Sequence, residues 1–251
     1  MKKFLCLISS ALVVSAAHAD NPSHLVIDLT TKSIISSLGE NNVRPIASIT
    51  KLMTALVIVE SNLDMNELVS YQGGIFRNKK VKRSELLESL LIKSDNAAAE
   101  ALAVSFIGGR QAFINTMNNR AKTLGMNNTF FEDPSGLGKN NISTAIDLSI
   151  LIDKSYEYSR ISETSSSKFF KVENVNKRKV TYVTVENTNS RLLNVFDNIV
   201  LSKTGFTSPA GRCLGIVVEK NKTKYAIIIL GEKNSNDRFN RAQSLISMVS
   251  E

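Results

Sequence analysis

The chain has 251 residues and a formal charge of +8, with 43% hydrophobic and 22% charged residues. These proportions exclude a disordered, collagen-like or disulfide-stapled chain, and the length is sufficient to bury a sizeable core. The basic excess alone favours polyanionic partners, nucleic acid among them.

Residues 1–19 have the pattern of a secretory signal. Lys2 and Lys3 precede the apolar stretch 4–17, and Ala17-His18-Ala19 fits a signal-peptidase site. The apolar stretch is shorter than the roughly 20 residues that a transmembrane helix needs. We therefore expect a cleaved signal peptide at 1–19 and a single domain at 20–251, with an uncut N-terminal anchor as the alternative.

Removal of this signal changes the counts that bear on function. The mature charge is +6, because Lys2 and Lys3 leave from the 31 basic residues while all 23 acidic residues stay. One histidine (His24) and one cysteine (Cys213) remain, so no internal disulfide can form. Export argues against nucleic acid and favours an acidic wall polymer or anionic lipid headgroups. No later apolar run is long enough to span a membrane, so we expect no transmembrane helix in the mature chain.

Alternating apolar residues predict strands near both ends of the chain. Leu25, Ile27 and Leu29 alternate with polar residues before Ile34, a pattern typical of a β-hairpin. Two further hairpins are predicted from 168–175 with 179–186 and from 213–219 with 224–230. Helical patterns cover 47–60, 84–92, 96–106, 110–124, 144–158 (with Ser143 or Thr144 as N-cap) and 237–249.

Strands at both ends with helices between them predict an α+β fold. We expect one antiparallel sheet flanked by helices, in which the N- and C-terminal strands pair.

The residue inventory excludes the commonest hydrolase and cofactor designs. With His24 as the one mature histidine, a Ser-His-Asp triad is poorly supported, and no Gly-x-Ser-x-Gly elbow is present. One cysteine and one histidine cannot build a His/Cys zinc site, and the glycine-rich phosphate and dinucleotide motifs are missing. We expect no metal and no cofactor. An enzyme with a nucleophile would need a base other than histidine.

Ser48-Ile49-Thr50-Lys51 supplies such a base at the start of the predicted helix 47–60. A spacing of three places Ser48 and Lys51 on one helix face, one turn apart. Burial among apolar neighbours would disfavour the charged lysine, and a neutral amine can take the serine proton. The spacing alone is weak, since Ser165 and Lys168 share it and are expected to face solvent.

Two other motifs are unique in the chain. Ser94-Asp95-Asn96 lies between predicted helices, where it is either an N-cap or a site in which Ser94 relays a proton to the leaving amine and Asn96 holds Lys51. Lys203-Thr204-Gly205 directly precedes a predicted strand. There the glycine would let a substrate chain approach, while Lys203 and Thr204 would meet its carboxylate or carbonyl.

Together and in this order, the three motifs resemble the active-site set of penicillin-binding proteins and serine β-lactamases. Residues 44–55 are similar to the nucleophile segment of the D-alanyl-D-alanine carboxypeptidase/endopeptidase family. Three further segments resemble its other signatures: 124–129, 133–137 (Asp-Pro-Ser-Gly-Leu) and 203–211. The resemblance covers almost the entire mature chain and implies a β-lactamase/transpeptidase-like fold.

The resemblance also implies a mechanism. Ser48 would attack a D-alanyl carbonyl with Lys51 as general base, and water would hydrolyse the acyl-enzyme. Ser94 and Asn96 would complete the proton network. The backbone N–H groups of Ser48 and Phe206 would form the oxyanion hole. Lys203, Thr204, Gly205 and Phe206 would line the substrate site. The partners implied are peptidoglycan peptides, with β-lactams as covalent inhibitors, in an exported, periplasmic protein whose loose association with membrane or wall stays open.

Departures from the family pattern favour its shorter endopeptidase branch, which cuts D-Ala–diaminopimelate cross-links. The chain ends soon after the helix 237–249, so we expect no appended β-domain or amphipathic anchor. Gly231-Glu232-Lys233 lacks the arginine that carboxypeptidases tend to carry there. Asp95 occupies the middle of Ser-x-Asn, as in many β-lactamases.

Two rival functions stay open. A class A β-lactamase would share the three motifs but needs a water-positioning glutamate, usually within Glu-x-x-Leu-Asn. No such string occurs, and Glu132 in the corresponding region stands in Glu-Asp-Pro-Ser-Gly-Leu. A non-catalytic cell-wall-binding module would keep the fold but not the chemistry. The intact set Ser48, Lys51, Ser94, Asn96 and Lys203 argues against it.

Overall fold

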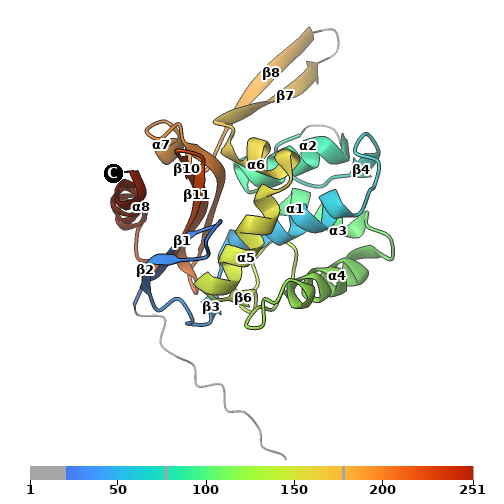
Figure 1. The fold of residues 1–251 in the computed structure, drawn as a ribbon. Coiled ribbons are helices and arrows are strands. Elements are labelled where there is room, and N and C mark those ends of the chain that lie inside the picture. The colour runs from blue at the N-terminus through green and yellow to red at the C-terminus, as the bar shows by residue number, and fades with distance from the viewer. Residues whose placement is uncertain (1–20, 77–78, 177–178, 251) are drawn as a thin grey trace, which may run out of the picture.

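A five-stranded antiparallel sheet forms the centre of the protein. The computed structural model describes residues 21–76, 79–176 and 179–250, so the expected signal segment lies outside the described residues. The strand order is β2-β1-β11-β10-β9, and β1 pairs with β11, so strands from the two ends of the chain lie side by side, as predicted (Figure 1). The strands are β1 (Ser23–Asp28), β2 (Ile34–Leu38), β9 (Ile199–Thr207), β10 (Gly211–Lys220) and β11 (Thr223–Glu232).

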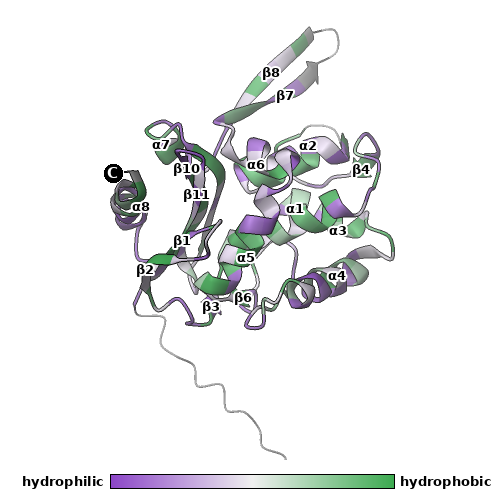
Figure 2. Cartoon of the chain, viewed as in Figure 1, coloured by the Kyte–Doolittle hydropathy of each residue, from purple (hydrophilic) through white to green (hydrophobic). Residues whose placement is uncertain are grey.

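The strands β1, β10 and β11 send alternate side chains to two separate hydrophobic layers. On β11, Ala226 and Ile228 belong to the larger core, which holds most of the helices, while Ile227 and Ile229 belong to a smaller core. The smaller core is closed by α8 (Ser235–Ser250), which packs on β10 and β11. Figure 2 shows hydrophobic residues along the sheet and hydrophilic residues on α8.

Most of the remaining helices lie on the opposite face of the sheet or at its margin (Figure 1), whereas the short helix with Leu192 and Leu193 packs into the smaller core. They are α1 (Thr50–Glu60), α2 (Arg83–Glu88), α3 (Asn96–Val104), α4 (Gly109–Thr123), α5 (Ala145–Tyr156), α6 (Ser159–Ser166) and α7 (Ser190–Leu193), with the 3₁₀ helix η1 (Ala47–Ile49) and the π-helix η2 (Ser89–Lys93). Three short two-stranded sheets complete the fold: β3 (Arg44–Pro45) with β6 (Ile142–Ser143), β4 (Leu68–Ser70) with β5 (Lys80–Lys82), and β7 (Phe169–Asn176) with β8 (Lys179–Glu186).

The α+β prediction and the three predicted hairpins are confirmed, with differences in local detail. The predicted helix 47–60 divides into η1 and α1, and 84–92 divides into α2 and η2. Thr144 is the N-cap of α5, where its side chain accepts a hydrogen bond from the Asp147 backbone at 3.1 Å. The prediction that Lys203-Thr204-Gly205 precedes a strand was wrong, because these residues lie inside β9. The hydrophobic pattern of the sequence also did not predict β9, α6 and α7.

Candidate active site

Ser48 lies in η1, the short turn that leads into α1. Ala47 before it has a φ of 47°, a left-handed conformation that residues with side chains rarely adopt. Gly136 packs so closely on this turn that an added Cβ would lie 1.9 Å from the Ala47 carbonyl oxygen. Strained backbone of this kind is typical of functional sites. The turn leaves Ser48 partly exposed, directly above Lys51, which is fully buried.

Three oxygen atoms from separate parts of the chain surround the Lys51 amine. Nζ lies 2.9 Å from Ser48 Oγ, 2.7 Å from Asn96 Oδ1 and 2.6 Å from the Ser135 carbonyl oxygen. An amide oxygen and a carbonyl oxygen can only accept, whereas a hydroxyl can also donate. When the amine is neutral, its two N–H groups can stay on Asn96 and Ser135. Its lone pair then faces the one partner that can give it a proton, the Ser48 hydroxyl.

The protonation state of Lys51 suits this arrangement. Burial lowers the pKa of Lys51 to about 7, while the negative charges of Asp133 and Asp95 act in the opposite direction. A substantial fraction of the amine is therefore neutral near pH 7. The predicted effect of burial on this lysine is present in the structure.

The Ser94-Asp95-Asn96 segment turns the chain sharply between η2 and α3. Ser94 adopts the left-handed conformation, with φ 61° and ψ 38°. Asp95, not Ser94, is the N-cap of α3, and it accepts hydrogen bonds from Ala97 N at 2.9 Å and from the Tyr71 hydroxyl at 2.7 Å. This turn directs Asn96 toward Lys51. Ser94 lies two residues before Asn96 in the chain. Lys51 bonds to Asn96 and not to Ser94.

The edge strand β9 runs past the Ser48 turn. A Cβ on Gly205 would lie 3.0 Å from Ser48 N and 3.2 Å from Ala47 Cβ, so the strand and the turn are in close contact. Phe206 follows Gly205, and its ring is about half exposed, with the Arg212 guanidinium 3.7 Å from its centroid. The Ser48 turn and the strand with Phe206, whose N–H groups the family resemblance implies as an oxyanion hole, are thus neighbours.

Lys203 and Thr204 occupy the buried part of the same strand. Thr204 Oγ1 donates to Thr188 Oγ1 at 2.7 Å. Burial, followed by the positive charge of Lys51, lowers the pKa of Lys203 well below its usual value. The described part of the chain offers Lys203 no ion-pair partner; its Nζ donates to the Thr204 carbonyl at 3.0 Å.

The structure adds one group that motif spacing did not reveal, the Ser135 carbonyl on Lys51. A backbone oxygen carries no sequence signal of its own. The segment Asp133-Pro134-Ser135-Gly136-Leu137 was noticed only through its family resemblance. Within 21–76, 79–176 and 179–250, no carboxylate bonds to Lys51 or Ser48. Glu132 instead accepts from Asn140 N at 3.0 Å and Asn140 Nδ2 at 2.8 Å.

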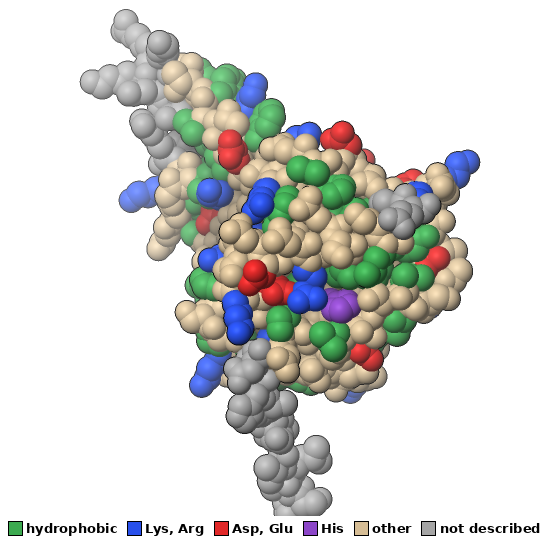
Figure 3. Space-filling view, turned by 90° about the vertical axis from the view of Figure 1, so that its left-hand side faces the viewer, with side chains coloured by type: hydrophobic (Ala, Val, Ile, Leu, Met, Phe, Trp, Pro, Cys, Tyr) green, Lys and Arg blue, Asp and Glu red, His purple; other side chains and the backbone are tan. Residues whose placement is uncertain are grey.

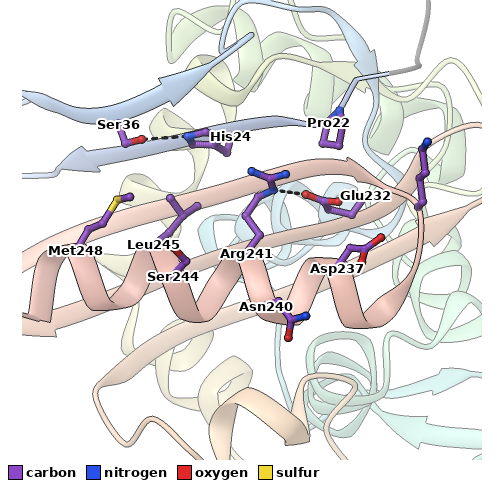
Figure 4. A pocket seen from close by; sticks show the side chains of 11 residues that line it. Pro22, His24, Ser36, Glu232, Asp237, Asn240, Arg241, Ser244, Leu245 and Met248 are labelled. Carbon is purple, nitrogen blue, oxygen red and sulfur yellow. Dashed lines mark hydrogen bonds and ion pairs between the residues drawn. The ribbon is translucent and has the colours of Figure 1, made fainter.

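His24 lies on the other face of the sheet, beside α8. Figure 3 shows the histidine side chain in a hollow next to basic side chains, and Figure 4 shows Arg241 reaching from α8 toward Glu232. This cavity of about 580 Å³ is separate from Ser48, and His24 Nε2 lies 3.0 Å from Ser36 Oγ. Its position therefore excludes His24 as a partner for Ser48. The described residues contain no cluster of three or more His, Cys, Asp or Glu side chains able to hold a metal ion, and no helix of membrane-spanning length and apolarity.

Similarity to known proteins agrees with these features. The family described as D-alanyl-D-alanine carboxypeptidase matches residues 10–234. A D-alanyl-D-alanine endopeptidase of Escherichia coli is 35% identical over 96% of this chain and 81% of its own length. One from Pseudomonas aeruginosa is 37% identical over 83% of this chain and 70% of its own length. A penicillin-binding protein of Listeria monocytogenes, solved in its ampicillin-bound form, has a TM-score of 0.81 at 27% identity and covers 91% of this chain and 96% of that one.

A family match over most of the chain, supported by relatives above 30% identity, establishes the class. The chain belongs to the D-alanyl-D-alanine carboxypeptidase family, as its motifs predicted.

Proposed function

We propose that this protein is a serine D,D-peptidase that acts on peptidoglycan stem peptides through an acyl-enzyme on Ser48. The observation that carries the proposal is the position of the Lys51 amine, 2.9 Å from the Ser48 hydroxyl, with its other two hydrogen-bonding positions on acceptors. The amine can therefore remove the serine proton without a histidine.

Acylation follows from this geometry. The Ser48 oxygen forms a bond to the D-alanyl carbonyl carbon as its proton passes to Lys51. The backbone N–H groups of Ser48 and Phe206 would stabilise the oxyanion. When the amide bond breaks, the proton returns from Lys51 to the leaving amine, by way of the Ser94 hydroxyl in this proposal. Water then hydrolyses the ester and restores Ser48.

Substrate binding rests on β9. An extended peptide lying antiparallel to this edge strand would place its scissile carbonyl beside Gly205, where no side chain separates it from Ser48. A substrate carboxylate near Lys203 and Thr204 would give the buried amine the anionic partner that it lacks in the described structure, and would restore its positive charge.

The bond we propose is the D-Ala–diaminopimelate cross-link, with D-Ala-D-Ala as a second substrate. The relatives from Escherichia coli and Pseudomonas aeruginosa are named endopeptidases, and other relatives are named carboxypeptidases. Binding of β-lactams is supported by the ampicillin-bound relative. Peptidoglycan as substrate and the signal-like residues 1–19 together support an exported, periplasmic protein.

The test is mass spectrometry of purified muropeptides after incubation with the protein. Cross-linked dimers should be converted to monomers, and pentapeptides should lose D-alanine more slowly or not at all. Release of D-alanine from pentapeptide with dimers left intact would contradict the endopeptidase preference. A Ser48→Ala control should leave both substrates unchanged.

A further inference from the structure

Asp133 accepts hydrogen bonds from five donors. Its Oδ1 receives Ser135 N, Ser135 Oγ and Gly136 N, each at 2.7 Å. Its Oδ2 receives Gly138 N at 2.7 Å and Asn141 Nδ2 at 2.6 Å. The carboxylate is buried, yet none of its bonds goes to Ser48 or Lys51. It therefore organises the loop 133–138, and nothing in the proposed mechanism uses it directly.

The loop that Asp133 organises is attached to the proposed catalytic helix at two points. The Pro134 carbonyl accepts from Thr54 Oγ1 at 2.6 Å, and the Ser135 carbonyl accepts from Lys51 Nζ at 2.6 Å. Lys51 and Thr54 are three residues apart and so lie on one face of α1. Two successive carbonyls can point at one helix face only if the loop backbone between them is held in a tight turn.

The fit of the loop against the nucleophile turn is also close. Gly136 has a φ of 82°, and a Cβ there would lie 1.9 Å from the Ala47 carbonyl oxygen. The hydrogen bond from Gly136 N to Asp133 fixes this residue next to the turn that presents Ser48. A displacement of the loop would thus move both the Ser135 carbonyl and the support of Ala47.

We propose that Asp133 is a positioning residue for the catalytic lysine: its carboxylate holds the Ser135 carbonyl on Lys51 and supplies the negative charge that acts on the amine. This role rests on the proposed function of Ser48 and Lys51. It assigns a function to the Asp-Pro-Ser-Gly-Leu segment, and it explains how a lysine base is oriented without a carboxylate in contact with it.

The charged groups around Lys51 determine how removal of the Asp133 charge should change the pKa of the lysine. Asp133 and Asp95 favour the protonated amine, and Lys203 is the neighbouring basic group. Hydrogen bonds from Ser135, Gly138 and Gly136 outweigh burial and hold the pKa of Asp133 below its usual range, so it stays ionised at neutral pH. Loss of this charge should therefore make Lys51 easier to deprotonate.

The test measures the second-order rate of acylation by a penicillin as a function of pH, in wild type and in Asp133→Asn. We expect the variant to be slower by about tenfold or more, because the lysine is no longer oriented. We also expect the midpoint of the acid limb to move to lower pH by about 0.5–1 unit, because a nearby negative charge is lost. A purely structural defect would lower the rate without moving the midpoint.

Two matched variants serve as controls. Glu132→Gln makes the same change at the adjacent residue, whose carboxylate bonds to Asn140, and should leave the midpoint in place. Ser135→Ala removes one donor to Asp133 but keeps its charge and the backbone carbonyl. It should slow acylation modestly without a shift in midpoint.

A double variant keeps the proposal testable if Asp133→Asn does not fold. Asp133→Asn with Asn141→Asp exchanges the carboxylate and the amide of a hydrogen-bonded pair. It should retain a midpoint close to that of wild type, with a reduced rate. An unchanged midpoint in Asp133→Asn, or a lowered midpoint in the double variant, would overturn the positioning role alone. A wild-type protein that is not acylated at Ser48 would overturn the proposed function as well.

Discussion

Gly205 of β9 lies against the backbone nitrogen of Ser48. A Cβ at position 205 would lie 3.0 Å from Ser48 N and 3.1 Å from the Ile46 carbonyl oxygen, so a side chain there would force the neighbouring backbone to move by a few tenths of an ångström. The contact joins an edge strand from the end of the chain to a turn from its beginning. It brings the N–H groups of Ser48 and Phe206 into one neighbourhood, which is the requirement for an oxyanion hole.

Gly205→Ala should therefore impair acylation more than stability. The methyl group would push β9 and the Ser48 turn apart by a few tenths of an ångström, which weakens both oxyanion donors. We expect the acylation rate to fall by about tenfold to hundredfold, as measured by stopped-flow with a chromogenic β-lactam. Gly74→Ala is the matched control, because a Cβ there meets nothing within 4 Å. Equal rates for Gly205→Ala and wild type would argue against the oxyanion role of this contact.

The pH dependence of acylation should report Lys51. Burial lowers the pKa of this amine to about 7, so protonated lysine dominates below that pH and cannot accept the Ser48 proton. The acylation rate should rise with pH through a midpoint near 7 and then level off. Lys51→Arg carries a charge that is not lost in this range and should be inactive throughout. A rate that is flat across neutral pH would contradict lysine as the base.

Lys203→Met separates substrate binding from folding. Wild-type Lys203 is buried, and the described residues give it no anionic partner, so removal of the amine should leave the melting temperature equal or higher. Binding of a substrate carboxylate should suffer, with kcat/KM lowered by about tenfold or more. Lys139→Met changes an exposed lysine in the same way and should leave kcat/KM unchanged. A marked loss of stability in Lys203→Met with normal kcat/KM would refute this assignment.

Periodicity predicted the fold well where side chains alternate or repeat. Leu25 to Ile27 and the apolar residues of β10 and β11 face two cores in turn, so their strands could be predicted from the sequence. The edge strand β9 was missed because its buried residues include Ser202, Lys203 and Thr204, which interrupt the apolar pattern. A strand whose buried residues are polar cannot be recognised from the hydrophobic pattern of its sequence.

The proposed site, too, was predicted in part from the sequence. The helical spacing predicted that Ser48 and Lys51 lie together, and the Ser94-Asp95-Asn96 motif predicted Asn96 on the lysine, where the structure has its Oδ1 at 2.7 Å. The Ser135 carbonyl and the positive φ of Ala47 are backbone features, which depend on tertiary contacts and not on side-chain identity. The roles of Ser94, Lys203, Thr204 and Phe206 stay predictions.

Cys213 is the one free cysteine of the described residues, and its reactivity matters for chemical labelling of the protein. It is fully buried, and burial raises the pKa of its thiol to about 11, so the thiol stays protonated and inert. A thiol-directed reagent is therefore not expected to label Cys213 in the folded protein.

The most direct measurement is peptide mapping of the protein after treatment with a penicillin. Wild type should gain one penicilloyl group, located by tandem mass spectrometry on Ser48 in the peptide that also contains Lys51. Ser48→Ala should gain none while it keeps its melting temperature, because in the described residues the Ser48 hydroxyl hydrogen-bonds to Lys51 alone. A penicilloyl group on another residue, or undiminished labelling of Ser48→Ala, would contradict Ser48 as the nucleophile.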